Sequence, residues 1–505
     1  MTVKHLRRVV NTVIVGNGPS ALILSYILHG HVPYYDASKP HPDPILHQKL
    51  SQSPCLLDVN VDDLTAHFGA SRLSYSTQAL PVNVLLDTLL RPLADTHPNE
   101  CGSCIKWVHR ERNKVDHIVV GNTAHTGGQW ADNPVSASWD IGSLSYAEML
   151  SLPGYSFKTH FANTNNGKLL PSFYRPTRRE VADYLSSYPK VVGIRGAMYT
   201  GTKLDGISST GRGFHIASHN IFCENLVLAS GVFTNLVPPR PLLQPLHNLP
   251  GPSSDVDAPI LVIGSGFTAA DVIISTPAGR KIIHLYKWDP DNHPSPLRAC
   301  HRSAYPEYAS VYRRMKLAAH QALGTAVVSP LPSKNDPFSK CDSDYEGLPN
   351  TYIKNVHLHD HYATLLLQTH DDRLITRDIS GIKYVVGRRG SLDFLDEHIR
   401  QGLLGSKDEG IPISTQSLRL KAEKSHEMSS HIFTVGSLTG DSLIRFAYGG
   451  CVLVAKGILD YSRRHSMTPD DSCSIPEVNR LTPEVRPGLE KQGKNLQANL
   501  EPIYG

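Results

Sequence analysis

Two stretches of the chain repeat one order of residues: a short apolar run, a glycine turn and an apolar helical stretch. The apolar runs, TVIV at 12–15 and ILVI at 260–263, are typical of strands buried in a parallel sheet. Each leads into Gly-x-Gly and then into a stretch of helical character, ALILSYIL at 21–28 and TAADVII at 268–274. A strand, turn and helix in this order open a βαβ unit, so the pattern predicts an α/β chain with parallel sheets.

Further apolar runs predict the other strands and the last helix. A strand is predicted at 224–231 and another at 281–288, and the sequence at 362–378 reads as two strands joined by a polar turn. Near the end, residues 431–459 predict a strand, a glycine-bearing turn and a final amphipathic helix. The Pro-rich stretch 235–259 is the predicted linker, 289–350 is irregular, and from about 466 the Pro-rich, charged tail is predicted to be disordered.

The first turn has the residues that a dinucleotide needs. It reads Gly16-Asn17-Gly18-Pro19-Ser20-Ala21, a G-x-G-x-x-A pattern. The first glycine permits the tight turn, the second lets the backbone approach a pyrophosphate, and Ala21 lets helix and strand pack closely. The second strand of this βαβ unit is predicted at 32–36, and Asp36 at its end lies about 20 residues after Gly16, the spacing at which a carboxylate reaches an adenosine ribose. The alternative is an ordinary βα turn.

The second turn repeats this geometry with a different partner. It reads Gly264-Ser265-Gly266-Phe267-Thr268-Ala269. At the end of its following strand stands Lys287 instead of an acid, and a cation there suits the 2′-phosphate of NADP. The two turns therefore predict FAD at the first site and NADPH at the second, although Lys287 alone could be a surface lysine.

The length, charge and composition of the chain argue against several classes of protein. A chain of 505 residues exceeds what one core supports, and a net charge of +4 without a basic stripe argues against nucleic acid, so a small-molecule partner is expected. The chain has no run of 18 consecutive apolar residues, so no transmembrane segment is predicted. The apolar run near the start is short and ends at Gly16, which is typical of a first strand and not of a leader. Eight irregularly spaced cysteines favour a reducing compartment, with the cytoplasm as the expected location.

Taken together, the motifs resemble those of flavin-dependent monooxygenases. The chain is most similar to the oxidative stress-induced growth inhibitor family, which is related to flavin-containing monooxygenases and amine N-hydroxylases. The resemblance covers about residues 10–462 and rests on both glycine turns, HPDPILHQKL at 41–50, GGQW at 127–130, NLVLASGVF at 225–233 and VGSLTGDSLIRFAYGGCVLVA at 435–455.

The resemblance implies further cofactor residues. It places Gly128, Gln129 and Trp130 near the flavin and includes Gly231 at the end of its strand. Gly440-Asp441 resembles a second FAD signature, in which the aspartate holds the ribityl chain and the following helix faces the flavin ring with its positive end. Asp441 could instead be only a helix cap.

The implied fold has two Rossmann-like dinucleotide-binding domains, the FAD domain being interrupted by the NADPH domain. The expected borders are 1–240 and 376–465 for the FAD domain, 241–375 for the NADPH domain with a substrate-side insertion at about 289–350, and 466–505 for the tail. The implied reaction is insertion of one oxygen atom from O2 into a small molecule, at nitrogen or sulfur, through a C4a-(hydro)peroxyflavin. No catalytic side chain, substrate or oligomeric state is predicted.

Alternatives remain open at this point. The F-x-G-x-x-x-H spacing of ketone-oxidising relatives is missing between the two turns, which puts that chemistry in doubt. A flavin-binding growth regulator without catalysis is one alternative, and a disulfide reductase that uses Cys101 and Cys104 is another. Arg178 or Arg179, behind a capping box at Thr177, could have a direct role or only belong to a packed helix. His357, His359 and His361 alternate, which favours a polar strand face over a metal site.

Overall fold

The computed structural model describes residues 9–71, 73, 75–93, 102–133, 135, 137–249, 258–324, 344–404, 413 and 417–466. The chain forms two compact units, Met1–Asp460 and Tyr461–Gly505. All elements below belong to the first unit, apart from the end of the last helix. The predicted tail beyond 466, part of the predicted linker and part of the irregular stretch lie outside the described residues. In the described part of the chain, no helix has both the length and the apolar character needed to cross a membrane.

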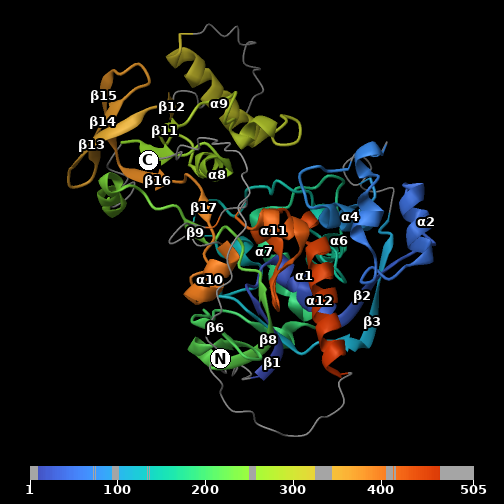
Figure 1. Ribbon diagram of the computed structural model, residues 1–505. Coiled ribbons are helices and arrows are strands. Elements are labelled where there is room, and N and C mark those ends of the chain that lie inside the picture. The colour runs from blue at the N-terminus through green and yellow to red at the C-terminus, as the bar shows by residue number, and fades with distance from the viewer. Residues whose placement is uncertain are drawn as a thin grey trace, which may run out of the picture. The chain divides into compact units, whose positions relative to one another are not determined.

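The larger sheet carries the first glycine turn (Figure 1). Five of its strands run parallel in the order β19-β8-β1-β4-β5. Strand β18 joins β19 and the hairpin β6–β7 joins β8, both in antiparallel pairing. The strands are β1 Val9–Val15, β4 His117–Val120, β5 Met198–Tyr199, β6 Ile207–Thr210, β7 Gly213–Ile216, β8 Ile221–Leu228, β18 Glu427–Ser429 and β19 Ile432–Thr434.

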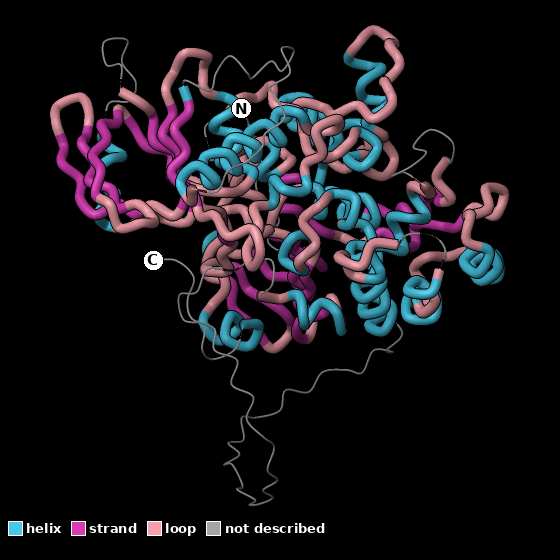
Figure 2. The backbone as a smooth tube through the Cα atoms, turned by 90° about the horizontal axis from the view of Figure 1, so that it is seen from above, coloured by secondary structure: helices cyan, strands magenta, loops and turns pink. Residues whose placement is uncertain are grey.

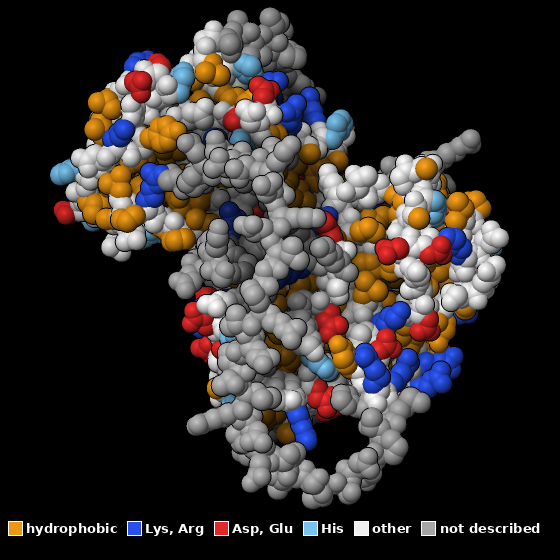
Figure 3. Space-filling model, viewed as in Figure 1, with side chains coloured by type: hydrophobic (Ala, Val, Ile, Leu, Met, Phe, Trp, Pro, Cys, Tyr) orange, Lys and Arg blue, Asp and Glu red, His pale blue; other side chains and the backbone are white. Residues whose placement is uncertain are grey.

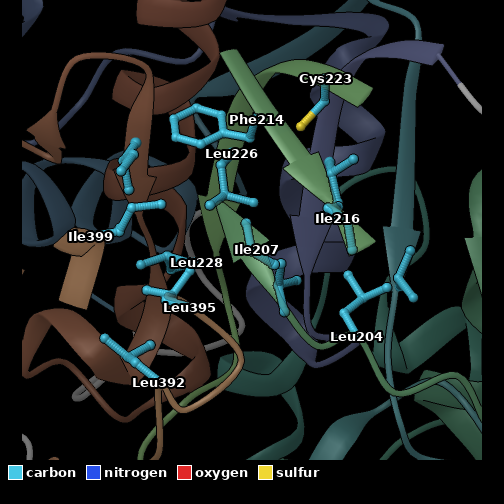
Figure 4. Packing of buried hydrophobic residues seen from close by; sticks show 14 of the residues in the cluster. Leu204, Ile207, Phe214, Ile216, Cys223, Leu226, Leu228, Leu392, Leu395 and Ile399 are labelled. Atoms are coloured by element: carbon cyan, nitrogen blue, oxygen red, sulfur yellow. The ribbon is translucent and has the colours of Figure 1, made fainter. Parts of the chain in front are cut away.

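Both faces of this sheet are buried, as its apolar strands predict. Val13 and Val15 of β1 pack on one face with the β6–β7 hairpin and α10 (Glu397–Leu404). Figure 4 shows this cluster, with Ile207 of the hairpin beside Leu226 and Leu228 of β8. Because side chains alternate along a strand, the fully buried Ile14 points to the other face. Helix α1 (Pro19–Leu28), of which Ala21–Leu28 are buried, contacts β4.

The strand that ends before Asp36 lies outside this parallel sheet. Strand β2 (His29–Tyr35) pairs antiparallel with β3 (Ile105–Lys114) in a separate two-stranded sheet, and β4 takes the place beside β1. The expectation that the first βαβ unit continues directly into 32–36 is therefore wrong. Helix α1 ends at Leu28 and β2 begins at His29, so the chain lacks the loop of several residues in which it would turn back into the sheet.

The second glycine turn belongs to a smaller sheet in which all strands are parallel. Its order is β12-β11-β10-β16, with β10 at Ile260–Ile263, β11 at Ile282–Tyr286, β12 at Tyr345–Pro349 and β16 at Gly381–Tyr384. Helices α8 (Phe267–Ser275) and α9 (Pro306–Ala322) pack on it through a cluster that includes Val262, Ala270 and Met315. Seen from above in Figure 2, helices border the strands of the parallel sheets. The α/β class with two dinucleotide-type units is confirmed.

The predicted pair of strands at 362–378 forms part of a three-stranded antiparallel sheet. Strands β13 (Tyr352–Leu358), β14 (Ala363–Gln368) and β15 (Leu374–Ile379) pair in sequence order. The fully buried Leu365 and Leu367 of β14 pack against the smaller parallel sheet. Hydrophobic side chains show on the outer surface of this region (Figure 3), and Tyr352 and Leu374 are each 62% exposed.

Two short strands connect the segments on either side of the second glycine turn. Strand β9 (Asn235–Leu236) follows β8, and β17 (Arg388–Arg389) follows β16, and the two pair antiparallel. The predicted domain borders near 240 and 375 lie between β9 and β17 in the sequence, and they stay predictions. The remaining helices are α2 Pro44–Gln52, α3 Val61–Thr65, α4 Pro81–Leu90, α5 Ala147–Leu150, α6 Phe157–Thr164, α7 Arg178–Val191, α11 Arg419–Lys424 and α12 Tyr448–Ser466.

Candidate functional site

The first glycine turn joins β1 to α1 in the conformation that its sequence predicts. Gly16 has a φ of +116°, and a Cβ atom there would lie 2.3 Å from the carbonyl oxygen of Ala229 at the end of β8. Gly18 is the N-cap of α1, makes no side-chain cap and has no atom within 4 Å of the place of a Cβ. Pro19 follows at the first helical position, as is common there. The uncapped end of α1 therefore has free space for a phosphate beside Gly18.

The GGQW segment lies directly against this turn. A Cβ atom on Gly128 would lie 3.2 Å from the Cα atom of Gly18. The backbone N–H of Gly127 donates to the carbonyl of Asn17 at 2.9 Å. The buried side chain of Asn17 contacts the loop that precedes GGQW, where it accepts from the Thr123 hydroxyl at 2.8 Å. Gln129 and Trp130 stay partly exposed. The structure thus brings together two of the segments that the resemblance implies.

Asn17 is a positioning residue that the sequence does not single out. It occupies the variable place of the Gly-x-Gly pattern, and a Cβ on Gly121 would lie 2.2 Å from its side chain. Its amide group also donates to the carbonyls of Thr123 and His125. These contacts fix the loop that leads into GGQW, and no local sequence signal reveals them because the partners lie more than 100 residues away.

The end of β8 and the segment 436–441, called the late glycine segment below, also contact one another and the first turn of α1. The N–H of Val232 donates to the Ser437 hydroxyl at 3.2 Å, and a Cβ on Gly231 would lie 3.1 Å from the same oxygen. A Cβ on Gly436 would lie 2.4 Å from the Ser20 hydroxyl in the first turn of α1. The Ser230 hydroxyl is buried here without a hydrogen-bond partner among the described residues. An orphaned hydroxyl beside an uncapped helix end fits a polar ligand such as FAD.

Asp441 is placed differently from the expectation. The helix after it was expected to begin at once, but α12 begins only at Tyr448, after a short 3-10 turn at Ile444–Phe446. Leu443 has an extended backbone, with φ −83° and ψ 139°, so the chain leaves the helical conformation between Asp441 and the 3-10 turn. The alternative that Asp441 is only the cap of this helix is therefore wrong, and the expectation that the positive end of the helix faces the flavin ring stays a prediction.

The carboxylate of Asp441 is buried and binds to α4 and α11. One oxygen accepts from the backbone N–H of Leu80 at 2.9 Å and from the Asn83 amide at 2.6 Å, and the other accepts from Arg419 at 3.1 Å. Gly440 precedes it with a φ of +95°. Asp441 thus fixes the late glycine segment onto α4, and its contact with a ribityl chain stays a prediction.

Asp36 lies at the end of β2, outside the sheet that carries Gly16. Its carboxylate accepts from the backbone N–H and the hydroxyl of Ser38, at 3.3 Å and 2.7 Å, and these bonds lower the pKa of Asp36 below its usual value. Among the hydrogen bonds of the described residues, none joins Asp36 to the first glycine turn. Its role toward a ribose stays a prediction.

The second glycine turn has the same features as the first. Gly264 has a φ of +146°, its N–H donates to the carbonyl of Leu285 at 3.0 Å, and a Cβ there would lie 2.5 Å from the carbonyl oxygen of Val385. Gly266 is the uncapped N-cap of α8, again with nothing within 4 Å of the place of a Cβ. Phe267, Thr268 and the buried Ala269 form the first turn of α8.

The fully buried side chain of His284 holds this second turn in place. Its Nε2 lies 2.6 Å from the carbonyl oxygen of Gly264, and its Nδ1 lies 2.8 Å from the Tyr345 hydroxyl. Burial lowers the pKa of His284 to about 4, so the ring is neutral at pH 7. Because a carbonyl only accepts, Nε2 carries the proton and Nδ1 accepts from Tyr345. The sequence gives no sign of this role, which depends on the strand order.

Lys287 directly follows β11, next to the second turn. Strand β11 is parallel to β10, with Leu285 paired to Ile263, so Lys287 lies at the carboxyl edge of the sheet where the Gly264 turn begins. The neighbouring backbone is fixed by Asn350, whose side chain bonds to both the N–H and the carbonyl of Trp288. This is the edge at which parallel sheets bind ligands.

Cys104 directly precedes β3 and His357 belongs to β13, so neither lies on the elements that form the two turns. Cys101 lies outside the described residues, and Cys104 is buried with 2% of its surface exposed. His357 lies on β13, whereas His359 lies beyond its end with its ring 4.7 Å from that of His357. In the described part of the chain, no group of three or more His, Cys, Asp or Glu residues is arranged to hold a metal ion.

Comparison of the sequence with known proteins finds relatives that cover most of the chain. No family model matches the chain. It is 26% identical to human oxidative stress-induced growth inhibitor 1 over 496 residues, covering 88% of this chain and 94% of the relative, and 25% identical to human oxidative stress-induced growth inhibitor 2 over 517 residues, covering 88% and 92%. The predicted resemblance to these growth inhibitors is confirmed.

Solved structures with similar folds include a flavin-containing monooxygenase from Stenotrophomonas maltophilia and a bacillithiol disulfide reductase from Staphylococcus aureus. The first has 11% identity, a TM-score of 0.45 and coverage of 91% of this chain and 100% of its own, and the second has 10%, 0.47, 92% and 100%. At these low scores the likeness does not distinguish between the two reactions.

Proposed function

We propose that the chain is a flavin-dependent monooxygenase that binds FAD at the first glycine turn and NADPH at the second. The observation that carries the proposal is the pair of uncapped helix ends, each with a second glycine that faces open space. Gly18 and Gly266 have extended backbones that other residues could adopt, so their own folding does not require glycine. A bound pyrophosphate gives a reason for glycine at both places.

The division of cofactors rests on the surroundings of the two turns. The first turn touches GGQW and the late glycine segment, and the orphaned Ser230 hydroxyl lies there. The second turn has Lys287 at its edge, a cation that suits the additional phosphate of NADPH. When bound, NADPH and FAD would supply the two electrons with which O2 donates one oxygen atom to the substrate and leaves the other as water.

The chain's own residues bind and orient in this proposal. Asn17 and Gly128 hold the GGQW segment at the first turn, and His284 holds the carbonyl of Gly264 at the second. We propose a small molecule with an oxidisable nitrogen or sulfur as substrate and the cytoplasm as the location, the latter on the irregular spacing of the eight cysteines.

A second candidate is a regulator that binds FAD without turning over a substrate. It is favoured by the names of the relatives, which are growth inhibitors. The disulfide reductase is less favoured, because Cys104 is buried and an exchanging thiol must be accessible.

Reduction by NADPH separates these candidates. We expect the FAD-loaded protein to lose the absorbance of oxidised flavin when NADPH is added without oxygen, and to oxygenate a panel of amines and thioethers when air is admitted. The Cys104→Ser variant should behave in the same way. Flavin that NADPH does not reduce would support the regulator, and loss of NADPH oxidation in Cys104→Ser would support the reductase.

The choice between NADPH and NADH tests Lys287. We expect Lys287→Glu to raise the KM for NADPH by about tenfold or more, equivalent to about 1.4 kcal/mol, because a carboxylate repels the 2′-phosphate. The KM for NADH should change by less than about twofold, since it lacks that phosphate. Lys281→Glu, with the same charge change at the opposite end of β11, is the control. Equal effects on both cofactors, or equal effects of both variants, would contradict this role.

A further inference from the structure

Arg388 is a partly buried cation that links the segments of the two glycine turns. It lies on β17, and its guanidinium donates to the Asn133 side chain at 2.5 Å and, more weakly, to the Gln129 side chain at 3.5 Å. Gln129 belongs to the GGQW segment that touches Gly18. The next residue, Arg389, is exposed and donates only to the carbonyl of Arg388 among the described contacts.

Arg178 is a second cation in the same region. It is the first residue of α7, and its guanidinium stacks on Trp139 at 4.1 Å from the ring centroid. Its Nε atom is buried and has no hydrogen-bond partner among the described residues. The first backbone N–H groups of α7 already have acceptors, namely the carbonyls of Ile141 and Trp139 and the hydroxyl of Thr177. A further ligand at this helix start would therefore bind to the Arg178 side chain.

Two carboxylates, those of Asp271 and Asp132, act on these two cations, but neither accepts a hydrogen bond from the Arg178 Nε atom. Arg178 is close enough to Arg388 to lower its pKa, in addition to the larger lowering by burial. Burial also lowers the pKa of Arg178, which Asp271 and Asp132 raise. Asp271, on α8, is enclosed, its pKa is raised by burial, and it already accepts from the Tyr308 hydroxyl at 2.7 Å. Asp132 is exposed, where solvent weakens its attraction.

A buried guanidinium atom without a hydrogen-bond partner, such as Arg178 Nε, is costly unless an acceptor joins it, and an anion would also offset the repulsion between Arg178 and Arg388. The planar fork of arginine matches carboxylate and phosphate oxygens, and stacking on an aromatic ring leaves its N–H edge available. We propose that Arg178 and Arg388 form an oxyanion site that takes a phosphate or carboxylate group of a small molecule. The anion could belong to the nicotinamide dinucleotide or to the substrate, and only this assignment rests on the proposed function.

Thermal unfolding of the full chain with inorganic phosphate tests the site. We expect phosphate, added at constant ionic strength with chloride as the balancing salt, to raise the Tm of the wild-type protein. Arg178→Met and Arg388→Met should require about tenfold or more phosphate for the same rise, which corresponds to about 1.4 kcal/mol. The exposed neighbours provide matched controls, and Arg179→Met and Arg389→Met should respond as the wild type does. An equal response of all five proteins, or none in the wild type, would overturn the site.

Two further arms identify the anion and guard against misfolding. If saturating NADP+ removes the additional effect of phosphate, the dinucleotide occupies the site; if acetate and phosphate still raise the Tm, the site belongs to the substrate. Should Arg388→Met not fold, Arg388→Lys keeps the charge without the fork and should retain a weakened response; an undiminished response would contradict recognition by that fork. Because phosphate binding needs no turnover, a wild type that binds it but does not oxidise NADPH would refute the proposed function alone.

Discussion

Replacing Gly16 by alanine is expected to leave little stably folded protein, with or without FAD. The new Cβ would lie 2.3 Å from a backbone oxygen at the end of β8, and the φ of +116° is unfavourable for any residue with a side chain. Neither strand can move away cheaply, because β1 and β8 are paired over their whole length in the centre of the sheet. We expect a loss of at least about 3 kcal/mol, out of the roughly 5–15 kcal/mol typical of folded domains.

The neighbouring glycine supplies the matched control for this variant. Gly18→Ala meets no atom within 4 Å and its backbone is extended, so the poorer N-cap and the lower entropy of the unfolded chain should nearly offset each other, changing the unfolding free energy of the FAD-free protein by less than about 1 kcal/mol. Chemical unfolding of both variants, followed by circular dichroism, measures this difference. Equal stability of Gly16→Ala and Gly18→Ala would show that the turn is not packed against β8 as described.

The glycine turns could be predicted from the sequence because their cause is local. A turn from a buried strand into a helix needs a positive φ at its first glycine, and Gly16 and Gly264 show +116° and +146°. The strands before the turns and the helices after them follow from runs of apolar residues, which the structure buries.

The partners of a strand and of a buried polar group could not be predicted in this way. Strand β2 follows α1 as the second strand of a βαβ unit would, yet it pairs with β3, whose residues lie about 70 to 85 positions later. Asp441 accepts from the backbone N–H of Leu80, which lies 361 residues earlier, so no local pattern reveals this partner. Arg388 follows an apolar run without any motif, and only the pairing of β17 with β9 places it beside Gln129.

The second large effect concerns the two open glycines, which should separate the two cofactors. A Cβ at Gly18 or Gly266 would enter the space that a pyrophosphate requires, while the protein itself has room for it. Each substitution should therefore weaken one cofactor by about tenfold, or about 1.4 kcal/mol, and leave the fold intact. Both variants make the same chemical change at the same position of the same motif, so each serves as the control for the other.

The most direct test is to measure the Kd values of FAD and NADPH for both variants, with FAD measured on the stripped protein and NADPH on the FAD-loaded one. We predict that Gly18→Ala binds FAD about tenfold more weakly but binds NADPH within about twofold of the wild type. Gly266→Ala should show the reverse, with FAD affinity retained and NADPH affinity lowered about tenfold. Variants that weaken both cofactors equally, or that change neither, would contradict the assignment of one turn to each cofactor.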